Sequence, residues 1–158
     1  NAFYLSRGIA VIHKKPIPIQ IVDVHYPSRN RAVIREAYYK TPSTTDYNGV
    51  WQGRYIDFEA KETQLSTSFP LQNIHEHQVN HMFAVKQQQG IAFFVIKFSK
   101  LERYFILFIE DFLPYWQRMK EGGRKSITLQ EFETSAYEFQ AGAFPELPYL
   151  EIVKQYTL

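Results

Sequence analysis

Residues 55–61 read YIDFEAK, in which apolar side chains alternate with polar or charged ones. Alternation with a period of two predicts a β-strand, because successive side chains point to opposite faces of a sheet. The apolar side chains would face a core, whereas Asp57, Glu59 and Lys61 would form a charged row on the other face. Neighbouring members of that row would lie about 6.6 Å apart, close enough to share one cation.

The segment before this strand contributes hydroxyl groups, turn residues and a further acid. Residues 43–49 read STTDYNG. Asn48-Gly49 favours the positive φ of a tight hairpin turn, and such a hairpin would bring Asp46 beside Glu59. We therefore expect Asp46, Glu59 and Lys61 to converge.

An acid, a spacer and then an acid-any-lysine row suits the hydrolysis of phosphodiester bonds. Carboxylates hold Mg²⁺, which prefers oxygen ligands, and a bound divalent metal supplies much of what this chemistry needs. A lysine beside the metal adds positive charge at the phosphate. The residues alone leave an alternative open, since Glu-x-Lys also occurs on solvated strand faces as a weak ion pair.

The bulk composition restricts the classes of protein. A chain of 158 residues fits one domain with a sizeable core, and the formal charge of +2 does not by itself indicate a nucleic-acid binder. The absence of cysteine excludes disulfides, zinc-thiolate sites and thiol catalysis, and suits a reducing compartment. No apolar run is long enough for a membrane span. Nothing near Asn1 resembles a signal peptide, and we expect a truncated N-terminus there.

The rest of the chain predicts a mixed β-sheet covered by helices, an α/β class. Ile17, Ile19 and Ile21 would lie on one face of an extended segment, in which Pro16 and Pro18 stand at alternate positions. We therefore expect an edge or a protruding ribbon rather than a central strand. The other predicted elements are a strand at 8–13, a helix from about Pro70 to Gly90, strands at 91–98 and 104–109, and helices at 111–120, from the Thr128–Glu131 capping box, and at 148–156.

The predicted helix after Pro70 carries two features that bear on function. Gln78 interrupts an apolar stripe, either as a buried amide bonded to backbone or as a ligand that reaches the carboxylates. His75, His77 and His81 form either a transition-metal site or, as we favour, a solvated face or a DNA-backbone contact. No histidine is suitably placed for a serine triad, and Gly122-Gly123 does not match a P-loop.

Several long blocks resemble the RecU family of Holliday junction resolvases, and together they cover almost the whole chain. The blocks are HKKPIPIQIV (13–22), PSTTDYNG (42–49), RYIDFEAKET (54–63), TSFPL (67–71), His77-Gln78, GRKSI (123–127) and PYL (148–150). The resemblance implies a restriction-endonuclease-like fold with a protruding stalk, a single nuclease domain over residues 1–158 with the stalk at about 16–39, and a homodimer.

The same resemblance implies roles for individual residues. Thr44, Asp46, Glu59 and Gln78 fall at positions that bind Mg²⁺, for which Mn²⁺ is a substitute. Lys61 falls at the position that stabilises the transition state, and Asp46, Glu59 and Lys61 would be the catalytic set. The residues expected to contact DNA are Arg29, Arg31, Arg35, Tyr38, Tyr39 and Lys40.

The implied activity is an endodeoxyribonuclease that nicks opposed strands of a four-way junction in recombination and DNA repair. It would work in the bacterial cytoplasm at the nucleoid, with other recombination proteins as candidate partners and no membrane. Two alternatives stay open: a sequence-specific duplex endonuclease of the same fold, and a junction-binding protein without catalysis.

Overall fold

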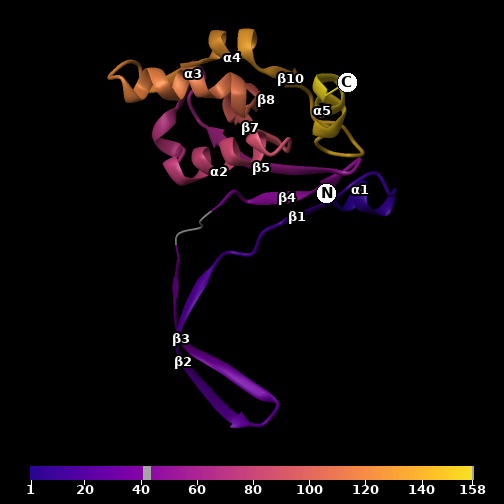
Figure 1. Ribbon diagram of the computed structural model, residues 1–158, viewed down its shortest axis with the longest axis vertical. Coiled ribbons are helices and arrows are strands. Elements are labelled where there is room, and N and C mark those ends of the chain that lie inside the picture. Colours follow the sequence, from indigo (N-terminus) through magenta and orange to yellow (C-terminus); the bar gives the residue numbers. More distant parts are fainter. Residues whose placement is uncertain (41–43, 158) are drawn as a thin grey trace.

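The computed structural model describes residues 1–40 and 44–157, and a six-stranded sheet forms the centre of its body (Figure 1). The strands run in the order β1 (Val11–Lys14), β4 (Tyr47–Trp51), β5 (Arg54–Thr63), β7 (Ile91–Phe98), β8 (Arg103–Phe108) and β10 (Tyr137–Phe139). β5 and β7 pair in parallel, whereas the other neighbours pair antiparallel. The sheet is therefore mixed, as the sequence predicts.

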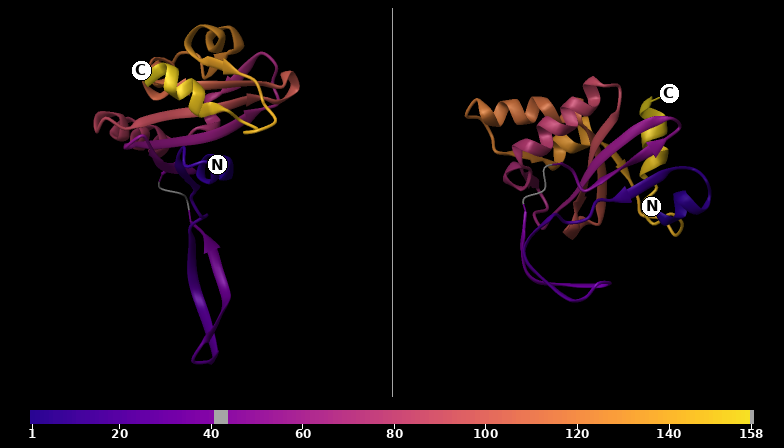
Figure 2. Two further views of the ribbon diagram at one scale, coloured as in Figure 1. Left: turned by 90° about the vertical axis from the view of Figure 1, so that its right-hand side faces the viewer. Right: turned by 60° about the horizontal axis from the view of Figure 1, so that its bottom comes forward.

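Helices cover both faces of this sheet, so it has a core on each side (Figure 2). On one face lie α2 (Glu76–Gln87), α3 (Ile109–Lys120) and α4 (Leu129–Ser135), and on the other α1 (Ala2–Ser6) and α5 (Tyr149–Thr157). β7 belongs to both cores, because Phe94 and Ile96 pack toward the first face and Phe93 and Val95 toward the second. The architecture agrees with the restriction-endonuclease-like fold that the resemblance implies.

Short elements complete the body. They are a two-stranded ladder of β6 (Ser68–Pro70) with β9 (Ser126–Thr128), and the 3-10 helices η1 (Leu71–Asn73) and η2 (Ser99–Leu101). The predicted capping box is confirmed: Glu131 N–H donates to Thr128 Oγ1, and Thr128 N–H donates to Glu131 Oε2. None of the helices in residues 1–40 and 44–157 is long and apolar enough to cross a membrane.

A two-stranded ribbon projects from the body as a stalk (Figure 1). It consists of β2 (Ile19–Ser28) and β3 (Arg31–Tyr39), and Lys40 N–H closes its base on Pro18 O at 2.9 Å. Nearly every residue of the ribbon is exposed, with Val24 half-buried. The prediction that this segment would not enter the sheet is confirmed, and it follows from prolines that cannot donate to a central ladder.

The predicted turn at Asn48-Gly49 is wrong. Both residues lie inside β4, and the chain reverses at Gln52 and Gly53, whose φ angles are 49° and 75°. Gly49 instead allows the close approach of the neighbouring β1, because a Cβ at this position would lie 2.0 Å from Val11 O. The hairpin exists, but its turn lies later in the chain.

The helix predicted from about Pro70 begins later, at Glu76. Residues 71–73 form η1, and Ile74 is extended with ψ of 131°. Gln78 Oε1 then accepts a hydrogen bond from His75 N–H at 3.2 Å, which satisfies a backbone donor at the helix start. Leu71, Ile74 and Met82 are nonetheless buried, so the predicted apolar stripe identifies the right side chains across two elements. The first strand likewise begins later than predicted, at Val11 instead of Gly8.

Candidate active site

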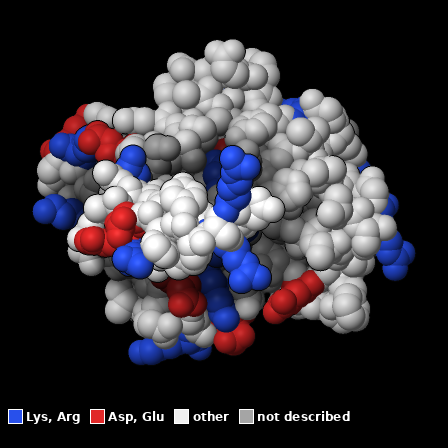
Figure 3. Space-filling model, turned by 90° about the horizontal axis from the view of Figure 1, so that it is seen from below, with Lys and Arg blue, Asp and Glu red and all other residues white. Residues whose placement is uncertain are grey.

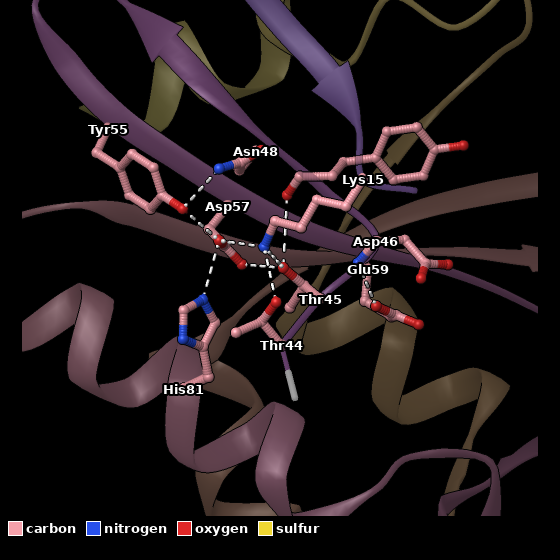
Figure 4. Close-up of polar contacts among 10 residues, drawn as sticks. Lys15, Thr44, Thr45, Asp46, Asn48, Tyr55, Asp57, Glu59 and His81 are labelled. Carbon is pink, nitrogen blue, oxygen red and sulfur yellow. Dashed lines mark hydrogen bonds and ion pairs between the residues drawn. The ribbon is translucent and has the colours of Figure 1, made fainter. Parts of the chain in front are cut away.

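The β4–β5 hairpin places Asp46 beside Glu59, as the sequence predicts. Tyr47 pairs with Phe58 in the ladder, so the residues just outside that pair become neighbours. Asp46 N–H donates a hydrogen bond to Glu59 Oε2 at 2.9 Å. Figure 4 shows the two carboxylates on the same side of the strands.

Lys61 lies beside the other oxygen of the same carboxylate. Its Nζ is 2.8 Å from Glu59 Oε1, and the side chain of Glu59 is 2% exposed whereas that of Lys61 is 21% exposed. Glu59 is thus held at both oxygens, and the positive group is the more accessible of the pair. The charged row is therefore not a solvated strand face, which was the alternative reading of the motif.

The charged row faces the side of the sheet that α2 covers. Asp57 is in register with Ala92 of β7, and Glu59 is in register with Phe94. Ala92 and Phe94 pack into the core on the α2 side. Side chains from the start and middle of α2 can therefore reach the charged row.

The donor set at this place fits a hard divalent cation. The Asp46 carboxylate makes no hydrogen bond or ion pair with any residue that the structure describes, and it is only half-buried. Thr44, two residues earlier, adds a hydroxyl oxygen. Within residues 1–40 and 44–157, no group of three or more His, Cys, Asp or Glu side chains could hold a metal. A site here would therefore combine two carboxylates with neutral oxygen ligands, which suits Mg²⁺ better than a transition metal.

Gln78 is buried near the start of α2, with 4% exposure. Its Oε1 accepts the His75 N–H, so the expectation of a buried amide bonded to backbone is met. An amide oxygen has a second lone pair, which leaves it able to act as a ligand as well. In the described part of the chain, no hydrogen bond joins Gln78 to Asp46 or Glu59, so its role as a ligand stays a prediction.

Asp57 is the centre of a second group of polar side chains, which we call the Asp57 cluster (Figure 4). The carboxylate is 0% exposed. Its four partners are Thr45 Oγ1, Tyr55 Oη at 2.9 Å, His81 Nε2 at 3.0 Å and Lys15 Nζ at 3.4 Å. Burial and the hydrogen bond to Asp57 raise the pKa of the Tyr55 phenol, which keeps it a proton donor.

The three histidines of the α2 region do not converge on a metal. The rings of His75 and His77 stack with centroids 5.6 Å apart, whereas His81 turns toward Asp57. The two favoured readings, a solvated face and a DNA-backbone contact, do not include this inward role for His81. Ser43, expected as a turn residue beside the site, lies outside the described residues.

The residues predicted to contact DNA all lie on or at the base of the ribbon. Arg29 is at the tip, Arg31 and Arg35 lie on β3, and all three are exposed. Tyr38 and Tyr39 end β3 with 61% and 82% exposure. Figure 3 shows Lys and Arg side chains on the projecting ribbon and around it, with acidic side chains among them. The ribbon is therefore an accessible surface with cations along β3 and two aromatic rings at its end.

Sequence reasoning missed Lys15 and the inward role of His81. Lys15 was part of a block that resembles RecU, but it carried no role of its own. Its contact with Asp57 spans 42 positions in the chain. Local patterns cannot reveal such a pair, because it depends on which strands become neighbours.

Comparisons with known proteins give matches over almost the whole chain. The family model described as "Recombination protein U" matches residues 1–155. A protein named Holliday junction resolvase RecU from Listeria welshimeri is 57% identical over 155 residues, which is 98% of this chain and 77% of the relative. Its namesake from Staphylococcus saprophyticus is 54% identical over 158 residues, covering 100% and 76%. A third, from Lactobacillus delbrueckii subsp. bulgaricus, is 56% identical over 153 residues, covering 97% and 73%.

Proposed function

This chain belongs to the RecU family, and on that premise we propose that it is an endodeoxyribonuclease that resolves Holliday junctions by nicks in opposed strands. The observation that carries this function is the contact of Asp46 with Glu59, with Lys61 on the opposite carboxylate oxygen. It joins two carboxylates that would bind the metal and a cation that would bind the phosphate.

The family implies a divalent metal, and we propose Mg²⁺, with Mn²⁺ as a substitute. Asp46 and Glu59 would hold it, with Thr44 and Gln78 as further oxygen ligands. A divalent cation bound there supplies charge neutralisation at the phosphate and activation of water. Glu59 is already oriented by Asp46 N–H, so its ligand oxygen needs little rearrangement.

Lys61 has a distinct task in this scheme. Its ammonium group is accessible enough to approach a phosphate, and the buried Glu59 carboxylate holds it in place. Negative charge develops on the phosphate oxygens in the transition state, and a fixed cation stabilises that charge more than it stabilises the ground state. Lys61 thus raises the cleavage rate without contributing to metal binding.

The ribbon supplies the selectivity for a branched substrate. We treat the chain as one nuclease domain, residues 1–158, in which residues of about 16–39 form the stalk. Arg29, Arg31 and Arg35 would contact phosphates, together with Lys40. Tyr38 and Tyr39 are exposed enough to stack on unstacked bases, which a junction centre offers and a continuous duplex does not.

Cleavage at paired positions requires two sites, so we propose a homodimer, with four-way junction DNA as the substrate. Other recombination proteins are candidate partners. An activity on chromosomal DNA would place the protein in the bacterial cytoplasm, at the nucleoid.

The test compares cleavage of a mobile four-way junction with cleavage of a linear duplex built from the same arms. The proposed function predicts paired nicks in the junction, dependent on Mg²⁺, and little cleavage of the duplex. Equal rates on both substrates would indicate a sequence-specific duplex endonuclease instead. Binding without cleavage at any metal concentration would indicate a junction-binding protein.

A further inference from the structure

Lys15 lies where the first arm of the ribbon leaves the sheet, and it contacts every residue from Thr44 to Asp46. Its Nζ donates to Thr44 Oγ1 at 3.1 Å and to Thr45 Oγ1 at 3.2 Å. Its backbone N–H donates to Asp46 O at 2.7 Å. One residue from a neighbouring segment thus holds the stretch that carries two of the proposed metal ligands.

Asp57 fixes the position of the Lys15 ammonium group. The two are 3.4 Å apart, and the Asp57 carboxylate is 0% exposed. A buried carboxylate is stable only when its oxygens are paired, so Asp57 cannot leave its partners without a large penalty. Those partners come from β5, through Tyr55, and from α2, through His81, as well as from Lys15 and Thr45. Asp57 is therefore tied to four segments of the chain.

We propose that Lys15 and Asp57 are positioning residues, which hold residues 44–46 in the geometry that binds the catalytic metal. This role rests on the proposed function and adds to it two residues that do not touch the metal or the phosphate. The Lys15 ammonium group donates to Thr44, Thr45 and Asp57, and the carboxylates of Asp46 and Glu59 are not among its partners. Side chains that orient metal ligands in this way contribute strongly to metal affinity.

Whether loss of the Lys15 side chain weakens or tightens metal binding distinguishes a positioning role from simple charge repulsion. A lysine close to a cation site repels the cation, so loss of its charge should tighten metal binding if charge were all that mattered. If Lys15 instead orients Thr44 and Asp46, loss of its side chain should weaken binding. The two explanations predict opposite signs for the same substitution.

The experiment measures Mn²⁺ binding to the DNA-free protein by electron paramagnetic resonance. Lys15→Met keeps the length of the side chain and removes its charge and its hydrogen bonds. We expect it to weaken Mn²⁺ binding by about tenfold or more. Lys15→Arg should fall between that variant and wild type, because a guanidinium can pair with Asp57 but cannot reproduce the bonds to both threonines.

Lys14→Met is the matched control. Lys14 is the adjacent lysine, it is exposed, and its Nζ lies over the Tyr47 ring, 5.8 Å from the centroid. This control removes the same charge from the same part of the chain without touching residues 44–46. We expect its Mn²⁺ affinity to be unchanged or slightly higher than that of wild type.

A second measurement follows junction cleavage as the Mn²⁺ concentration is raised. A positioning defect shifts the concentration needed for half-maximal cleavage, and saturating metal restores most of the maximal rate. Far-UV circular dichroism and a thermal melt confirm that each variant is folded. Unchanged or tighter Mn²⁺ binding by Lys15→Met, or by Lys15→Arg should the methionine variant not fold, overturns the positioning role.

Failure of the metal site itself gives a different result. If wild type binds no Mn²⁺ and Asp46→Asn behaves the same way, the metal site of the proposed function is wrong, and the role of Lys15 fails with it. If wild type binds Mn²⁺, Asp46→Asn loses it and Lys15→Met retains it, only the positioning role is wrong.

Discussion

Asp46 and Glu59 are joined through the main chain of one and the side chain of the other: Asp46 N–H donates to Glu59 Oε2 at 2.9 Å. The contact leaves the Asp46 carboxylate free to act as a ligand while it orients the carboxylate of Glu59. A backbone donor does not depend on the identity of its side chain, so the geometry of the site and its charge can be altered separately.

Glu59→Gln should remove the charge and keep that hydrogen bond, since an amide oxygen also accepts from Asp46 N–H. We expect junction cleavage to fall by at least about 100-fold, because the metal loses a negative ligand. Binding of the four-way junction in Ca²⁺, measured by gel shift, should stay within about twofold, since backbone phosphates dominate affinity. Cleavage at the wild-type rate would show that Glu59 is not a metal ligand.

Lys61→Ala should lower the maximal cleavage rate by about 100-fold or more, the usual effect of losing a group that stabilises transition-state charge. Single-turnover rates at saturating Mg²⁺ measure this directly. Lys97→Ala is the matched control, because Lys97 lies on the adjacent β7 and pairs with the exposed Glu102 at 3.8 Å. A loss that disappears at higher Mg²⁺ concentration would assign Lys61 to metal binding instead.

Local patterns predicted the parts of the site that depend on one strand and its neighbour. The alternation at residues 55–61 placed Glu59 and Lys61 on one face, and chain reversal placed Asp46 beside them. The turn was assigned wrongly because Asn-Gly is a strong hairpin signal, whereas Gly49 serves the close approach of β1. Close approach between strands is a tertiary property, and a sequence pattern does not report it.

The Asp57 cluster could not be predicted for the same reason. Lys15 and His81 lie 42 and 24 positions from Asp57, on either side of it in the chain. Their contact requires β1 to pair with β4 and α2 to cover the charged face of β5. The late start of α2 has a local cause. Ile74 is extended, and the Gln78 side chain accepts from His75 N–H, so the helix begins at the next residue.

Glu131 offers a test of stability against pH that is independent of the active site. Hydrogen bonds from Arg118 lower the pKa of Glu131 to about 2, against the opposing effect of burial, and the Thr128 N–H adds to the lowering. A depressed pKa means that the charged form stabilises the fold. That stabilisation is fully present above the unfolded value of 4.5 and is lost as the pH falls through about 2.

Glu131→Gln should therefore lower the free energy of unfolding by roughly 1 kcal/mol at pH 7. The difference from wild type should shrink as the pH falls from 4.5 toward 2, as measured by urea denaturation across this range. Glu121→Gln is the control, since Glu121 is exposed and accepts from Gln117. A deficit that persists unchanged at the lowest pH would mean that the lost interaction is not ionic.

Neutralisation of the ribbon arginines should weaken DNA binding and make it less dependent on salt. Each phosphate contact that is lost reduces the slope of log K against log salt concentration by about 0.9. The triple variant Arg29→Gln, Arg31→Gln, Arg35→Gln should therefore reduce the slope by up to about 2.7 for each protomer that binds. Fluorescence anisotropy with a labelled junction measures it, and an unchanged slope would place these arginines away from the phosphates.

Replacement of residues 27–35 by a short Gly-Ser turn should leave the body folded and abolish junction cleavage. Every residue of β3 is exposed, and β2 contributes none to either core, so no buried contact is lost. The thermal midpoint should change little, because exposed segments carry little of the stability. Mn²⁺ binding should also persist, since Lys15 and Asp46 keep their contact at the base of the ribbon. A shortened protein that binds metal but does not cut the junction would assign substrate selection to the ribbon, whereas full cleavage would show that the body alone recognises the branched DNA.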